Sequence, residues 1–188
     1  ALHLCAPLAG EDRVVTLNNC EFTATELNKT AIEVDAKMGP YTLNINNTTA
    51  TGFKVSETTG ESLFNIKSEP EKVTIYVNGL KWSKDGYTDE NGDESFQATT
   101  NEDFTAAIAE IPAGETGTIS LYAGEYTFPA SKLHEGITVN CAEGTVFKGS
   151  SSLDVNGATI IGAAFENESG RAASSTIEGT FKNCVFSG

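Results

Sequence analysis

The sequence of 188 residues lacks what a membrane-spanning or nucleic-acid-binding protein needs. It contains no run of about 18 consecutive apolar residues, the length that a transmembrane helix requires. Only 12 basic residues stand against 26 acidic ones, and the formal net charge of -14 repels phosphate backbones and anionic lipid surfaces. We therefore expect no nucleic-acid partner and no membrane insertion.

Motifs of catalysis and metal binding are also missing. The chain has no GxSxG, HExxH or phosphate-binding glycine loop, so we predict neither an enzyme nor a bound cofactor. Its four cysteines have no CxxC spacing, which makes zinc a poor candidate: Cys5, Cys20, Cys141 and Cys184. Each lies in or beside an apolar run, which is typical of small buried side chains. A disulfide between Cys20 and Cys184 would require the two ends of the chain to meet.

What the sequence does contain is short alternation of apolar and polar residues. Within residues 1–82 the alternating runs are VVTLNNCEF, TAIEVDA, YTLNINN, SLFNIK and VTIYVNGLKW. A period of two predicts half-buried strands, and the turn-forming residues MGP, TTG and SEPE separate them. Similar short strands between glycine corners follow over residues 117–188. The pattern indicates an all-β protein.

The middle of the chain differs from both ends. Residues 83–103 read SKDGYTDENGDESFQATTNED, almost without aliphatic side chains, and we predict a linker or exposed loop over 83–100. After it, Thr100 and Asp103 fit a helix capping box, and apolar residues recur at helical spacing up to Ile111, where Pro112 ends the run. We predict one short amphipathic helix near residues 101–111, with strand repeats in 1–82 and in 101–188.

Asn recurs where the predicted strands end. The copies are NNC at 18–20, NNT at 46–48, VNG at 77–79, VNC at 139–141, VNG at 155–157 and KNC at 182–184. Asn tolerates the left-handed conformation of a sharp corner, and stacked corners would align its amides in an internal ladder. Asn is also common in ordinary turns. The number of copies in similar apolar surroundings favours structural repeats.

These features resemble a known fold family. The helix followed by GTISL at 117–121, AGEYTF at 123–128 and GITVNC at 136–141 is similar to the start of right-handed parallel β-helix domains of the pectate-lyase-like superfold. The LNNCEF and FKNCVF phrases are similar to coils of β-helix proteins from phages and bacterial surfaces. The resemblance implies a β-helix (solenoid) in which the helix caps the apolar core.

Three groups of residues are candidates for a site, each with a plainer alternative. Glu33 and Asp35 share one strand face, as catalytic carboxylates do, but the pattern favours a solvated outer face opposite Ile32 and Val34. Trp82, with Tyr76 and Tyr87, could stack on a sugar, or Trp82 could plug the first strand stack. DENGDE at 89–94 places Asp89, Asn91 and Asp93 in the alternation of a calcium loop, or forms a solvated acidic turn.

The resemblance and the lack of a reaction centre favour a non-catalytic structural protein of a phage virion, as a head decoration or fibre component. We expect a homo-oligomer that contacts other virion proteins, since joining Cys184 to Cys20 of a following copy spans 24 residues, about one coil. The alternatives are a secreted polysaccharide lyase or hydrolase fragment, and a bacterial cell-surface adhesin that binds a host glycan.

Overall fold

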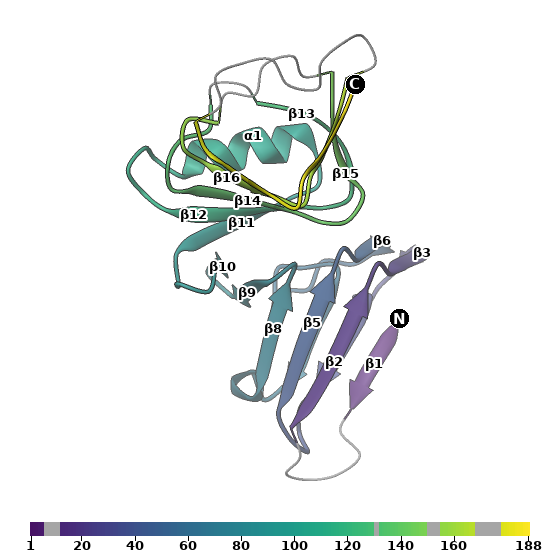
Figure 1. Cartoon of the computed structure of the whole chain (residues 1–188). Helices are drawn as coiled ribbons and strands as arrows, with labels where there is room; N and C mark the ends of the chain where they lie inside the picture. The colour runs from purple at the N-terminus through teal and green to yellow at the C-terminus, as the bar shows by residue number, and fades with distance from the viewer. Residues whose placement is uncertain (6–11, 130–131, 150–154, 168–177) are drawn as a thin grey trace. The chain divides into compact units, whose positions relative to one another are not determined.

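The computed structural model describes residues 1–5, 12–129, 132–149, 155–167 and 178–188 (Figure 1). The chain divides into two compact units, which we call the first unit (Ala1–Asp85) and the second unit (Gly86–Gly188). Both are built from short strands, and the described residues contain one α-helix. The prediction of an all-β fold is confirmed at this level.

The first unit contains nine strands and the short 3-10 helix η1 (Pro70–Lys72). The strands are β1 (Leu2–Cys5), β2 (Arg13–Asn18), β3 (Glu21–Leu27), β4 (Ile32–Asp35), β5 (Tyr41–Asn46), β6 (Thr49–Phe53), β7 (Phe64–Ser68), β8 (Val73–Val77) and β9 (Leu80–Ser83). They pair in the orders β1-β4-β7, β2-β5-β8-β9 and β3-β6. All pairs are parallel except β8 with β9.

Alternation along the strands explains the core of the first unit. In β4 and β5 every second side chain is buried, and Ile32, Val34, Leu43 and Ile45 are fully enclosed. The registers repeat along the chain, with Leu2 opposite Ile32 and Ile32 opposite Phe64. Apolar side chains of one repeat therefore stack on apolar side chains of the next, and each strand adds a layer to one apolar core.

The described part of the second unit contains ten strands and the helix α1 (Asn101–Glu110). The strands are β10 (Gly86–Thr88), β11 (Glu94–Ala98), β12 (Gly117–Leu121), β13 (Gly124–Thr127), β14 (Ile137–Cys141), β15 (Thr145–Lys148), β16 (Thr159–Ile161), β17 (Ala164–Glu166), β18 (Thr180–Lys182) and β19 (Val185–Ser187). They pair in the orders β10-β11-β12-β14-β16-β18 and β13-β15-β17-β19. Apart from the β10–β11 hairpin, every pair is parallel.

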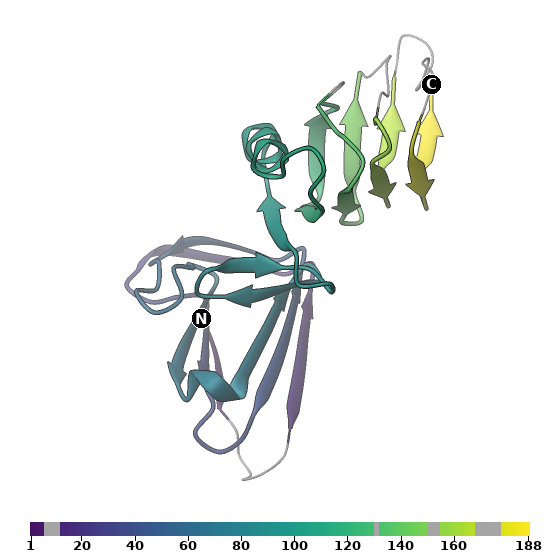
Figure 2. The same cartoon turned by 90° about the vertical axis from the view of Figure 1, so that its left-hand side faces the viewer.

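The second unit repeats a strand, a corner and a second strand. Among the described residues the four repeats β12–β13, β14–β15, β16–β17 and β18–β19 follow one another side by side (Figure 2). Their inward rings form a column, with Phe147 and Phe165 stacked at a centroid distance of 5.2 Å. Helix α1 lies at one end of this series of strands, and the C-terminal strands lie at the other (Figure 2).

The predicted helix is confirmed, with its capping box. The Thr100 hydroxyl accepts the Asp103 N–H at 3.1 Å, and the Asp103 carboxylate accepts the Thr100 N–H at 3.1 Å. The helix buries Phe104, Ala107 and Ile108 against the core of the second unit. Its apolar face therefore covers the inner side chains of β11 and β12, which it contacts.

Residues 83–100 differ from the predicted linker. The segment contains β10 and β11, and the two units divide between Asp85 and Gly86. Ser95 and Ala98 are buried although the surrounding sequence is polar. The prediction missed β11 because its polar sequence has little strand character of its own. The strand forms through its backbone pairing with β12, a distant segment.

The predicted Asn corners are confirmed at five of the six positions. Asn19, Asn47, Asn78, Asn156 and Asn183 have φ between 44° and 55°, the left-handed conformation. Asn140 is the exception, since it lies within β14 in extended backbone. In the first unit the amides do form a ladder, in which the Asn47 Nδ2 donates to the Asn19 Oδ1 at 2.8 Å and the Asn78 Oδ1 accepts the Asn47 N–H at 2.6 Å. This ladder lies at the surface rather than inside.

Candidate functional site

The pair Glu33 and Asp35 lies on the outer face of β4. The intervening core residues Ile32 and Val34 are fully buried, so the two carboxylates point away from the core, with side-chain exposures of 36% and 16%. This is the solvated outer face that the alternation of the sequence indicated.

Neighbouring strands bring a lysine and a histidine to these carboxylates. Lys67 of β7 places its Nζ 3.6 Å from the Glu33 Oε1 and 3.8 Å from the Asp35 Oδ2. His3 of β1 places its Nε2 3.5 Å from the same Glu33 oxygen. Sequence reasoning missed both partners, because Lys67 becomes a neighbour only through the register that sets Glu33 opposite Asn65.

The electrostatics of this cluster suit an ionised, hydrogen-bonded carboxylate. A hydrogen bond from the Ser68 hydroxyl, at 2.5 Å, lowers the pKa of Asp35, and the Lys37 N–H and the Lys67 charge lower it further against the opposing effect of burial. A glycosidase acid requires the opposite, a raised pKa that keeps the proton until it is transferred. The surroundings of Asp35 therefore stabilise its ionised form, the opposite of what a general acid at this position requires.

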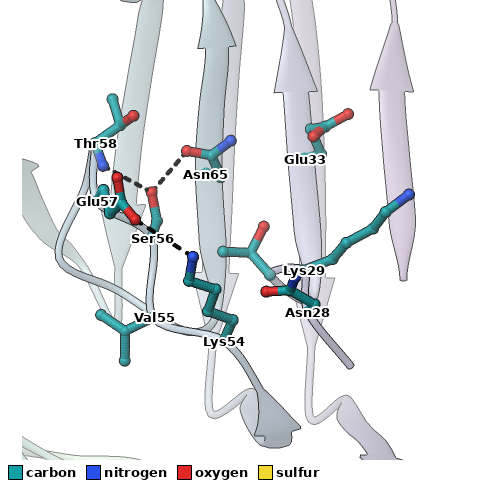
Figure 3. Close-up of a pocket in the computed structure, with 10 residues that line it drawn as sticks. Asn28, Lys29, Glu33, Lys54, Val55, Ser56, Glu57, Thr58 and Asn65 are labelled. Carbon is teal, nitrogen blue, oxygen red and sulfur yellow. Dashed lines mark hydrogen bonds and ion pairs between the residues drawn. The ribbon is translucent and has the colours of Figure 1, made fainter. Parts of the chain in front are cut away.

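A polar pocket lies beside this cluster (Figure 3). Its volume is about 290 Å³, and its lining comes from two segments that follow β3 and β6, together with β4 and β7: Asn28, Lys29, Thr30, Glu33, Lys54, Val55, Ser56, Glu57, Thr58 and Asn65. The Ser56 hydroxyl donates to the Asn65 Oδ1 at 2.7 Å and accepts the N–H groups of Thr58 and Thr59 at 3.1 Å. Hydroxyl, amide, ammonium and carboxylate groups thus face one space, a set that can bind a hydroxyl-rich ligand such as a sugar.

Trp82 packs onto the core of the first unit. Its ring meets the buried Phe64 edge to face, with centroids 5.4 Å apart and planes at 86°. This contact fits the interpretation of Trp82 as a plug, because the ring covers a core residue. Tyr76 is half-buried in the same unit, and Tyr87 is half-buried in the second.

The acidic segment 89–94 is an internally bonded turn. The Asp89 Oδ1 accepts the N–H groups of Asn91 and Asp93, and its Oδ2 accepts the Thr118 hydroxyl at 3.2 Å. These bonds occupy the carboxylate that the calcium hypothesis assigned to the ion. Among the described residues no cluster of three His, Cys, Asp or Glu side chains could hold a metal.

All four cysteines are free thiols, and Cys20 and Cys184 are not joined. Cys5 is exposed, which corrects the expectation of buried cysteines, because it occupies an outward position at the end of an edge strand. The other three are partly buried, and burial raises the pKa of Cys141 to about 12.

Comparison of the chain with protein-family models, with curated proteins and with solved structures gave no match. Within the described residues no helix is long and apolar enough to cross a membrane.

Proposed function

We propose that this chain is a non-catalytic structural protein whose repeats wind as a right-handed parallel β-helix, and that it serves in a phage virion as a head decoration or fibre component. The observation that carries the proposal is the parallel stacking of strand on strand through both units, with Asn corners in register in the first unit. Such stacking satisfies backbone hydrogen bonds along an axis and slows unfolding, which suits a particle that persists outside cells.

The charge distribution supports a structural role. The carboxylates of β4 are held by Lys67 and Ser68, and the lowered pKa of Asp35 favours a permanent ion pair. The strongly acidic composition keeps the surface solvated and disfavours contact with nucleic acid.

Two measurements test this function. An antibody against the chain should label purified phage particles from its source, and the purified chain should release neither reducing sugar nor unsaturated uronide from a panel of polysaccharides. Recovery of the protein only from culture medium or cell surfaces, away from particles, would contradict the virion assignment. Sugar release that disappears in Glu33→Gln would replace it with the polysaccharide-degrading alternative.

Glycan binding is the second candidate, and the polar pocket favours it. Lys29 and Asn28 line the pocket and are exposed. If the pocket binds a host glycan, Lys29→Ala and Asn28→Ala should each weaken binding on a glycan array by about tenfold, the loss of one hydrogen bond to a charged or polar group. Lys84→Ala, an exposed lysine of the same unit outside the pocket, is the matched control. Equal binding by all variants would remove this candidate.

A further inference from the structure

The first and last corners of the described chain are the same structure. Asn19 joins β2 to β3 and Asn183 joins β18 to β19, with φ of 52° and 55°. A cysteine follows each Asn, and each thiol contacts the carbonyl two residues before it. The Cys20 Sγ lies 3.5 Å from the Asn18 oxygen, and the Cys184 Sγ lies 3.4 Å from the Lys182 oxygen.

The backbone bonds that link one corner to the next are also the same in both units. In each unit the left-handed corner residue donates to the strand end of the next repeat, and the first residue of the next repeat's second strand donates back. The pairs in the first unit are Asn19 N–H to Asn46 O at 2.9 Å and Thr49 N–H to Cys20 O at 3.0 Å. The pairs in the second unit are Gly162 N–H to Lys182 O at 2.9 Å and Val185 N–H to Ala163 O at 3.0 Å.

The strands that flank these two corners are the edge strands of their sheets. In the described residues β2 and β3 pair only with the repeat that follows them, and β18 and β19 pair only with the repeat that precedes them. In the described residues of the 188-residue chain, each of these two edges therefore has a paired repeat on one side only. Since both ladders are parallel, the two edges offer matching sets of backbone donors and acceptors.

The side chains at these edges are partly uncovered. Phe186 stacks on Phe165 with centroids 4.9 Å apart and planes at 7°, yet 45% of Phe186 is exposed. Val185 beside it is 64% exposed. Phe22 follows Cys20 by two residues, as Phe186 follows Cys184, and is half-buried. The ring column of the second unit thus ends on an exposed ring, and an equivalent ring stands at the other edge.

We propose that the edge formed by β18 and β19 binds the edge formed by β2 and β3 of a second copy of this chain, as the next repeat of one continuous ladder. Asn183 lies opposite Asn19 of the second copy, Cys184 opposite Cys20, and Phe186 opposite Phe22. The proposal rests on the structural function above and specifies its partner.

This register follows from the bonds within each unit. The Asn183 N–H donates to the Asn18 carbonyl of the second copy, and the Glu21 N–H of that copy donates to the Cys184 carbonyl. The contact joins two different edges, so each copy keeps one edge for another neighbour. Head-to-tail contacts of this kind give rings where the rotation between copies closes and open filaments where it does not.

Sedimentation of matched variants tests the contact. The 188-residue chain should associate into a series of species as its concentration rises. Phe186→Asp and Phe22→Asp should each remain monomeric, while their 1:1 mixture should form dimers and nothing larger, because one intact edge of each kind remains. Met38→Asp, which adds the same charge at an exposed site between β4 and β5 and away from both edges, should associate like the unchanged chain. A chain that stays monomeric at every concentration overturns the proposal.

Disulfide trapping tests the register. Neighbouring strands lie about 4.8 Å apart, within the Cα separations that a disulfide spans. In a chain that carries Cys5→Ser, which removes the exposed thiol and in which all variants of this test are made, oxidation with diamide should give a ladder of cross-linked species that a thiol reductant reverses. Cys20→Ser or Cys184→Ser alone should abolish it, the mixture of these two variants should give cross-linked dimers only, and Cys141→Ser should leave the ladder intact.

Other outcomes distinguish a failure of the proposed contact from a failure of the proposed function. Cross-linking of Cys20→Ser with itself would show a Cys184 to Cys184 contact and overturn the proposed register. A chain that labels virions but neither associates nor cross-links refutes this contact and leaves the structural function standing. A chain that forms the ladder but is absent from particles refutes the virion assignment alone.

Discussion

The two units share the same corner structure, but they differ in the length of the repeat that contains it. Residues paired between neighbouring parallel strands are 26 to 33 positions apart in the first unit, and 18 to 23 positions apart in the second. The first unit distributes each repeat over three sheets and the second over two. Repeat length is therefore set by the segments between corners, and the corner itself is independent of it.

Register is maintained by polar groups in one unit and by rings in the other. In the first unit Asn46 donates to Asn18 at 2.9 Å beside the Asn47 to Asn19 bond, which ties the corners directly. In the second unit Phe147, Phe165 and Phe186 stack inside while Gly162 occupies one corner. A side-chain amide fixes register by its directionality, whereas a ring does so by its shape and buried area.

Removing a ring should give the largest effect. Phe147 is fully buried and contacts Phe104, Tyr126, Phe128 and Phe165. Phe147→Ala should cost about 3–5 kcal/mol of unfolding free energy, because it removes the ring and leaves a cavity. Hydrogen exchange should show faster exchange in β12–β17.

The matched variant for this test is Leu43→Ala in the first unit, where Leu43 is fully buried. It should cost about 2–5 kcal/mol and accelerate exchange in β4 and β5 instead. If each variant accelerated exchange equally in both units, the molecule would unfold as one body and the comparison of two separate cores would fail.

Replacing a glycine where two strands approach closely should give the second largest loss of stability. Gly52 has φ of 80°, and a Cβ there would stand 1.8 Å from the Ala24 carbonyl oxygen across the β3–β6 pair. Gly79 has φ of 82° with nothing within 4 Å. Both alanine variants should lose about 1–2 kcal/mol to the left-handed backbone. Gly52→Ala should lose about 1–3 kcal/mol more to the overlap.

Urea denaturation measures this difference. Equal midpoints for Gly52→Ala and Gly79→Ala would indicate that β3 and β6 separate without cost, so that this pair contributes nothing to the register of the first unit.

The Asn ladder should contribute less than the rings. Asn47→Gly keeps the left-handed corner and removes the side-chain bond to Asn19, so it should cost about 0.5–1.5 kcal/mol. Asn47→Ala should cost about 1–2 kcal/mol beyond that, since alanine resists the left-handed conformation. Thermal denaturation of the two variants separates the ladder from the corner. If Asn47→Gly were as stable as the unchanged chain, the side-chain bond to Asn19 would contribute nothing, and only the backbone conformation of the corner would matter.

The sequence predicted the features that depend on local chemistry. The capping box of Thr100 and Asp103, the outward Glu33 and Asp35, and the left-handed Asn corners each follow from one short segment. The strands β10 and β11, the lysine and the histidine beside Glu33 and the pocket could not be predicted, because each requires the register between segments far apart in the chain. Asn140 shows the limit of the corner motif, since VNC occurs there inside a strand and a nearby Gly144 supplies a positive φ.

Lowering the pH should give the smallest loss of stability, and it should affect both units. Partial burial raises the pKa of Asp103, but hydrogen bonds from Thr99 and Thr100 together lower it below its usual value. In the first unit the Ser68 hydrogen bond lowers the pKa of Asp35. Each carboxylate therefore contributes stability that is complete above the unfolded pKa of about 3.9 and is lost as the pH falls through the lower folded value.

Asp103→Asn and Asp35→Asn separate these contributions. Each should be less stable than the unchanged chain at pH 7, and the difference should shrink as the pH falls below about 4. Glu102→Gln, in the same helical turn as Asp103, is the control and should leave the pH dependence unchanged. NMR titration of the two aspartates gives the direct measurement. A folded pKa above 3.9 for Asp103 would mean that burial outweighs its hydrogen bonds, and the helix would then be more stable in acid.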